Sequence, residues 1–152
     1  MTLEACLARI AQDWEALTPS TRIHARYHAL DGSEAIYGSD PTSVGLDMVA
    51  DRGFAFDVGS RTTIEESADD LVRCVYQVVA TLIASVGEIG HRDASESLAA
   101  DIRQLARAVE DRSTWPAGVL EVLTGAAEIN EPEDDSGLAS ATLELMLFVE
   151  EE

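Results

Sequence analysis

The chain has 152 residues, 46% hydrophobic and 26% charged, so its composition is that of a globular protein and excludes an intrinsically disordered one. Its formal net charge is -19 and its ten basic residues are all arginine, which disfavours direct nucleic-acid binding, because that depends on Lys and Arg to neutralise phosphates. The length suits one folding unit, and we expect residues 1–152 to form a single α+β domain.

The N-terminal segment predicts an amphipathic helix that Thr2 caps and that ends before Pro19. Its apolar residues recur at intervals of three and four: Leu3, Cys6, Leu7, Ile10, Ala11, Trp14 and Leu17. The segment lacks the basic start and continuous apolar core of a signal peptide. No apolar run reaches the roughly 18 residues that cross a bilayer. We therefore expect a cytoplasmic protein that does not bind membranes.

Alternating apolar residues after this helix predict an antiparallel β-meander of about four strands. The stretch "RIHARYHAL" (22–30) alternates strictly, and "DG" at Asp31 and Gly32 turns the chain into "EAIYG" (34–38). A second pair of strands is expected at "VGLDMVA" (44–50) and "FAFDV" (54–58), with "DRG" as the turn between them.

From about Ile64 the apolar spacing becomes helical and predicts three to four helices packed on one face of the sheet. The first is expected over 64–86, with Thr63 and Glu66 as a capping box. A second helix carries Leu98 to Val109, and Pro116 opens a third that runs to Leu123. Residues 138–152 alternate like a strand but contain strong helix formers, so the state of 138–149 stays open, and we favour a helix.

The stretch 22–30 has a basic side chain at every second position, namely Arg22, His24, Arg26 and His28. On a strand, residues four apart are separated by roughly 13 Å, so the two histidines cannot share a metal ion. We interpret the stripe as a sheet face that balances neighbouring carboxylates. Presentation of Arg22 and Arg26 to an acidic partner is the alternative.

The last quarter of the chain concentrates negative charge, because no basic residue follows Arg112. Such a field attracts a basic partner and raises the rate of encounter with it. The acidic loop at 130–137 lacks the pattern of a calcium loop, which needs alternating oxygen ligands, a glycine at a fixed place and a closing glutamate. We therefore predict a surface that binds a basic protein, formed by Glu128, Glu131, Glu133, Asp134 and Asp135.

The sequence contains no catalytic or cofactor-binding signature. Cys6 and Cys74 lie far apart at apolar helical spacing and are expected to be buried thiols. His91 is expected in a loop before a helix that Asp93 or Ser95 caps, where an anion beside Arg92 is the alternative. There is no phosphate-binding loop, nucleophile elbow or dinucleotide fingerprint. We expect no enzyme activity, no metal and no cofactor.

A small, acidic α+β protein without catalytic motifs resembles in type the immunity proteins that neutralise bacterial toxins, and phage-encoded inhibitors that mimic nucleic-acid charge. The likeness rests on size and charge alone. It implies a non-catalytic inhibitor that binds a basic partner such as a toxin. The alternative is a structural or assembly protein, of a phage or a secretion system, that self-associates as a homodimer or larger species through the apolar stretch "LELMLFV" (143–149).

Overall fold

The computed structural model describes residues 2–17, 27–29, 52–66, 70–85, 90–130 and 138–151. Helix α1 (Thr2–Glu15) precedes the short strand β1 (Tyr27–Ala29), and the long strands β2 (Arg52–Glu66) and β3 (Val72–Ser85) follow. Helix α2 (Gly90–Glu110) then leads to the last two strands, β4 (Val119–Ile129) and β5 (Leu138–Glu151).

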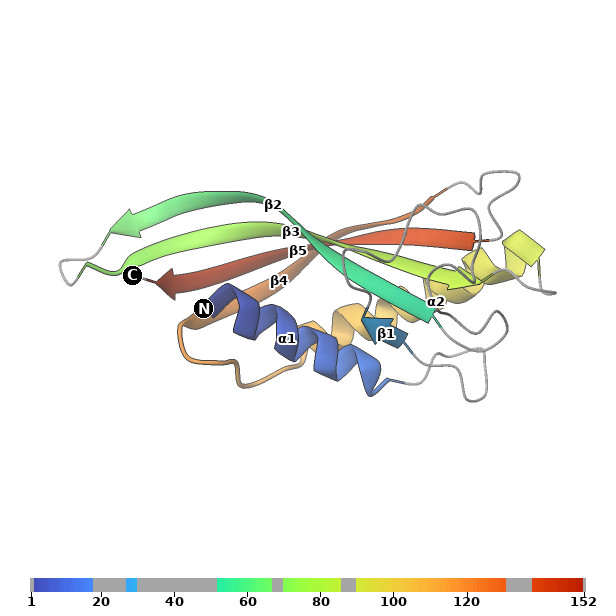
Figure 1. Ribbon diagram of the computed structural model, residues 1–152, viewed down its shortest axis with the longest axis horizontal. Coiled ribbons are helices and arrows are strands. Elements are labelled where there is room, and N and C mark those ends of the chain that lie inside the picture. The colour runs from blue at the N-terminus through green and yellow to red at the C-terminus, as the bar shows by residue number, and fades with distance from the viewer. Residues whose placement is uncertain are drawn as a thin grey trace.

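The strands form one five-stranded sheet in the order β1-β2-β3-β5-β4. β1 pairs in parallel with the first residues of β2, and every other pairing is antiparallel. Figure 1 shows both helices on one side of this sheet, with the far ends of β2 and β3 extending past the N-terminus of α1. None of the described helices is long and apolar enough to cross a membrane.

The core lies between the helices and the sheet. α1 buries Cys6, Ile10 and Trp14, and the Trp14 ring packs edge-on against Phe54 of β2 with the ring centroids 5.2 Å apart. The indole Nε1 of Trp14 donates a hydrogen bond to the carbonyl oxygen of Leu105 in α2, at 3.1 Å. One aromatic side chain therefore joins both helices to the sheet.

The predicted fold class is wrong in its arrangement of elements, although a mixture of helices and strands is compatible with the structure. Only two helices occur in the described parts of the chain. The described residues of the expected helix 64–86 belong mainly to the end of β2 and to β3. The expected helix from Pro116 to Leu123 is not formed, and its residues from Val119 onward belong to β4. The segment 138–149 belongs to β5. The helices over 2–17 and 98–109 are confirmed as α1 and α2.

Strand β3 looks helical in the sequence because it is apolar on both faces. Val78, Ala80 and Leu82 face the helices and are buried, while Val75 and Val79 on the other face are only partly exposed. A continuous apolar run offers helical spacing as readily as strand spacing. The many β-branched residues of this segment favour a strand.

The predicted meander is corrected where the structure describes it. The expected strand 54–58 is confirmed within the longer β2. Of the expected strand 22–30 only 27–29 is described, and it pairs in parallel with β2 rather than in an antiparallel hairpin. The expected strands 34–38 and 44–50 lie outside the described residues.

Candidate functional site

Only Glu128 of the predicted partner-binding surface lies among the described residues. It is exposed near the end of β4, paired with Thr142 of β5. Glu131, Glu133, Asp134 and Asp135 lie outside the described residues. The predicted binding surface as a whole therefore remains a prediction.

The basic stripe is described at one position only. Arg22, His24 and Arg26 lie outside the described residues, and His28 is placed in β1 by its backbone. His91 belongs to the first turn of α2, so its predicted place in a loop is wrong. Cys6 and Cys74 are free and buried, as predicted, and burial raises the pKa of the Cys6 thiol to about 12.

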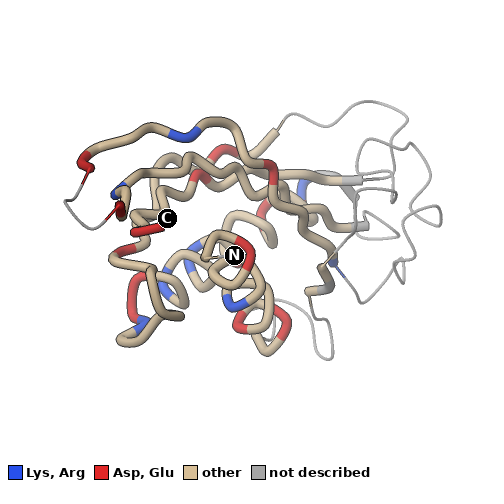
Figure 2. The backbone as a smooth tube through the Cα atoms, turned by 60° about the vertical axis from the view of Figure 1, so that its left-hand side comes forward, with Lys and Arg blue, Asp and Glu red and all other residues tan. Residues whose placement is uncertain are grey.

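Glu128 belongs to a wider acidic surface on the side of the sheet that faces away from the helices. Residues paired across antiparallel strands point to the same face, and the pairings give this face Glu121, Glu128, Glu144 and Glu150 on β4 and β5. Figure 2 shows acidic positions along the strands as well as on the helices. Sequence reasoning missed Glu144 as part of this surface because it assigned the segment to a helix.

A buried polar cluster joins the start of β2 to α2. Nη1 of Arg52 lies 2.5 Å from Oδ2 of Asp101, and Nη2 donates to the hydroxyl of Ser97. The hydroxyl of Tyr27 donates to the same Asp101 oxygen at 3.1 Å. All four side chains are almost fully buried, so the cluster holds β1, β2 and α2 together.

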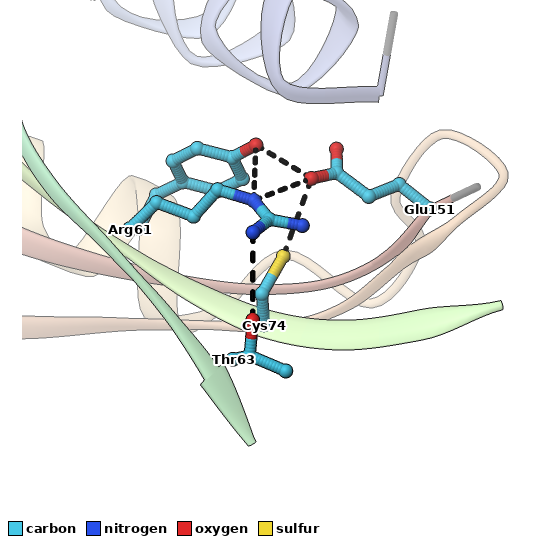
Figure 3. A network of polar contacts seen from close by, with 5 residues as sticks. Arg61, Thr63, Cys74 and Glu151 are labelled. Carbon is cyan, nitrogen blue, oxygen red and sulfur yellow. Dashed lines mark hydrogen bonds and ion pairs between the residues drawn. The ribbon is translucent and has the colours of Figure 1, made fainter. Parts of the chain in front are cut away.

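A second polar cluster lies at the far end of the sheet, and we call it the Glu151 cluster. One carboxylate oxygen of Glu151 accepts hydrogen bonds from the hydroxyl of Tyr76 at 2.6 Å and from Nε of Arg61 at 2.9 Å. The thiol of Cys74 lies 3.4 Å from the same oxygen, and Nη1 of Arg61 reaches the Thr63 hydroxyl at 3.5 Å. Figure 3 shows these side chains converging from β2, β3 and β5.

The Glu151 cluster pairs one charged carboxylate, Glu151, with one charged guanidinium, Arg61, among neutral hydroxyl and thiol groups. The hydrogen bond from Tyr76 holds the pKa of Glu151 below its ordinary value, while burial raises the pKa of both Cys74 and Tyr76. A thiol with a raised pKa is a poor nucleophile at neutral pH. The cluster therefore fastens the end of β2 to β3 and β5, and its thiol is not activated as a nucleophile.

A shallow groove runs between α1 and residues 112–116. The small side chains of Ala5, Ala8 and Ala11 form one wall, and Trp115 and Pro116 form the other. Arg112 lies over the Trp115 ring, 5.2 Å from its centroid, and pairs with Asp13. In the described parts of the chain, no three His, Cys, Asp or Glu side chains are placed to hold a metal ion.

Both outer strands of the sheet present hydrogen-bonding edges with no described partner. β1 covers β2 only at Arg52, Gly53 and Phe54, so Ala55–Glu66 pairs on one side alone among the described strands. In the part of the chain that the structure describes, β4 pairs only with β5. Such edges carry unpaired N–H and C=O groups that can pair with another chain.

Irregularities in these two strands expose large apolar side chains. The pairing of β2 with β3 skips Ile64, and the pairing of β4 with β5 skips Leu120, so each lies at a β-bulge. Ile64 is 57% exposed and Leu120 is 51% exposed, the highest values among the large hydrophobic residues described. Sequence reasoning missed both residues because it placed each in a helix.

Three comparisons with known proteins were made. No protein-family model matches the chain, and no curated protein matches it. A chain in a solved structure described as "Virion of native gene transfer agent (GTA) particle" is similar in fold, with a TM-score of 0.54 and 15% sequence identity. The match covers 98% of this chain and 97% of that chain, so the likeness extends over the whole fold.

Proposed function

We propose that this chain is a structural component of a phage-like particle and that it acts by associating with further copies of itself. One observation carries the proposal: among the described strands the sheet ends at two edges without a pairing partner, each bearing an exposed large apolar residue, Ile64 or Leu120. Open edges of this kind are normally blunted or covered in a monomeric protein.

The similar fold in a gene transfer agent virion supports the same proposal. That match extends from end to end of both chains, so no large part of either fold is left without a counterpart.

The contact proposed here differs from the one that the sequence suggested. The apolar stretch 143–149 was expected to mediate self-association, but it forms the centre of β5, where Leu143, Leu145, Leu147 and Val149 are buried under the helices. Its hydrophobicity is explained by the core of one chain. The free edges take its place as the contact.

Net charge predicts how this association responds to salt. Each copy carries a formal charge of -19, so copies repel one another, and the attraction must come from apolar and backbone contacts. Raising the ionic strength from about 50 to about 500 mM shortens the reach of the repulsion. Association between copies should therefore strengthen with salt.

Sedimentation velocity at several protein concentrations and at both salt levels tests the proposal. We expect species larger than the monomer, and we expect their fraction to rise with concentration and with salt. A strict monomer under all these conditions would refute the proposal.

The inhibitor hypothesis has no support from the comparisons, and it predicts the opposite salt dependence. Attraction between an acidic inhibitor and a basic toxin weakens when salt screens it. A complex with a basic protein that forms more slowly at high salt, together with a monomeric free state, would favour that hypothesis over ours.

A further inference from the structure

We infer that copies of this chain join head to tail, with the β2 edge of one copy pairing with the β4 edge of the next. The inference rests on the proposed function and identifies the partner of each edge. Three observations support it: the length of sheet that each edge spans, the directions of the two strands, and the positions of their exposed apolar residues along the strands.

The two free edges span the same length of the sheet. The paired residues Val58, Val78, Leu145 and Thr124 form one row across the four long strands. Further along, Thr63, Cys74, Val149 and Val119 form another row. Nearly all of the free part of β2 therefore lies level with β4, on the opposite side of the sheet.

The directions of the strands suit continuous pairing between copies. β2, β3, β5 and β4 alternate in direction, so β2 and β4 run in opposite directions within one sheet. If a second copy is related to the first by rotation about an axis parallel to the strands, its strands run in the same directions as those of the first copy. Its β2 then meets β4 of the first copy in the antiparallel sense, and the sheet continues from copy to copy.

The exposed apolar residues lie within about one residue of the same level, with Ile64 on the Glu150 side of the row that contains Val149 and Leu120 on its Phe148 side. Ile64 and Leu120 each adjoin the row that contains Cys74 and Val149. Pairing β2 with β4 of the next copy brings these two side chains together without a shift along the strands. A head-to-tail contact without such a shift closes into a ring when the rotation between copies divides a full turn, whereas a shift generates a helical filament.

Pairing of like edges fits the molecule less well. An antiparallel contact between two copies of β4 brings their exposed carboxylates, Glu121 and Glu128, toward one another, and like charges opposite each other are destabilising. An antiparallel contact between two copies of β2 separates their Ile64 side chains toward opposite ends of the contact. Either arrangement also leaves the other edge of each copy unpaired.

A mixing experiment tests the inference. Ile64→Glu blocks the β2 edge and Leu120→Glu blocks the β4 edge, and because both side chains are exposed, the fold should tolerate each change. Ala99→Glu on the exposed face of α2 adds the same charge away from both edges and serves as the control. Circular dichroism checks folding, and Ile64→Gln with Leu120→Gln replace any variant that fails to fold.

Head-to-tail pairing predicts that each blocked variant alone associates at least about tenfold more weakly than the parent chain, while the control variant associates normally. An equimolar mixture of the two blocked variants should form a one-to-one pair and nothing larger. The Leu120→Glu variant still has an unblocked β2 edge and the Ile64→Glu variant still has an unblocked β4 edge, so only these two edges can pair. Mass photometry or sedimentation velocity measures both results.

Other outcomes separate the inference from the function on which it rests. A homodimer of either blocked variant, or a mixture that forms no pair, would overturn head-to-tail pairing. Association unchanged in both variants would assign the contact to another surface, which overturns the inference and leaves the proposed function standing. A parent chain that is monomeric throughout would refute the proposed function itself.

Discussion

Strands β5 and β4 are neighbours in one sheet, yet their environments differ sharply. On β5, every described side chain that faces the helices is buried, from Ala139 to Val149. On β4, Val122 is buried and most other residues are exposed. β2 changes in the same way along its length, from buried Phe54 to a run of exposed residues after Phe56.

The comparison shows that apolar side chains have two different roles in the same sheet. Those of β3 and β5 stabilise the folded chain, whereas Ile64 and Leu120 on the outer strands contribute little to its core. Substitutions should therefore affect stability in one region and association in the other.

Removing one member of the buried ion pair should cost the most stability. Asp101→Ala leaves the guanidinium of Arg52 buried without its carboxylate, and we expect a loss of about 3–5 kcal/mol in the free energy of unfolding. Urea denaturation measures the loss. The double variant Arg52→Met/Asp101→Leu should recover much of it, and a double variant as unstable as Asp101→Ala would contradict this account of the pair.

Matched leucine substitutions test the comparison of β5 and β4 directly. Leu147→Ala empties a fully buried site and should cost about 2–5 kcal/mol of folding free energy. Leu120→Ala changes a half-exposed side chain and should cost about 0.5 kcal/mol or less. Thermal or urea denaturation of both variants gives the contrast, and equal losses would show that β4 belongs to the core as much as β5 does.

Gly118 lies just before β4, where the chain contacts α1 and β5. Any larger residue at this position should lower the stability of the fold. The φ of Gly118 is +90°, and a Cβ there would lie 2.9 Å from Oγ1 of Thr2 and 3.0 Å from the carbonyl oxygen of Glu150. Its own carbonyl oxygen accepts a hydrogen bond from the amide of Glu150 at 2.7 Å. Gly118→Ala should therefore destabilise the fold by about 1–3 kcal/mol, which urea denaturation can measure.

Gly125→Ala offers a comparison on the same strand. A Cβ at Gly125 would lie 3.2 Å from the side chain of Glu144 and 3.8 Å from its backbone carbonyl oxygen, and the φ of Gly125 is not positive. We expect it to cost less than Gly118→Ala. The reverse order would mean that the join of β4 to α1 is less tightly held than the structure indicates.

The smallest effect should come from Glu151→Gln and should depend on pH. Hydrogen bonding from Tyr76 and Arg61 lowers the pKa of Glu151 from its ordinary value of 4.5, so the folded chain binds this proton less tightly than the unfolded chain does. The carboxylate therefore stabilises the fold above about pH 4.5, and this contribution is lost as the pH falls through the lower folded-state pKa.

The difference in stability between the parent chain and Glu151→Gln should accordingly shrink on acidification. Urea denaturation of both proteins at neutral pH and below pH 4 measures it. A difference that stays constant, or grows, as the pH falls would contradict the assigned role of Glu151.

Periodicity predicted the elements whose apolar residues lie on one face. α1 and α2 each bury a single stripe, such as Cys6, Ile10 and Trp14, and both were predicted from their spacing. Cys6 on α1 was predicted to be buried for the same reason, whereas Cys74 is buried as predicted but lies on β3 and not on the expected helix. One-sided burial leaves a clear period in the sequence.

The inner strands were missed because both of their faces are partly buried. In β5 the alternation of Leu143, Leu145 and Leu147 was the correct signal, but the strong helix formers of the segment, alanine, leucine, glutamate and methionine, favoured a helix. Free edges and bulges cannot be found by periodicity at all, because they depend on which strands pair. Ile64 and Leu120 became visible only from the register of the sheet.

Amide hydrogen exchange at low and at high protein concentration tests the central claim most directly, because it reports on the backbone of each edge. The account predicts that amides of β2 after Phe54 and amides of β4 become more protected as concentration rises, while those of β3 and β5 do not change. Association without added protection at both edges would contradict it.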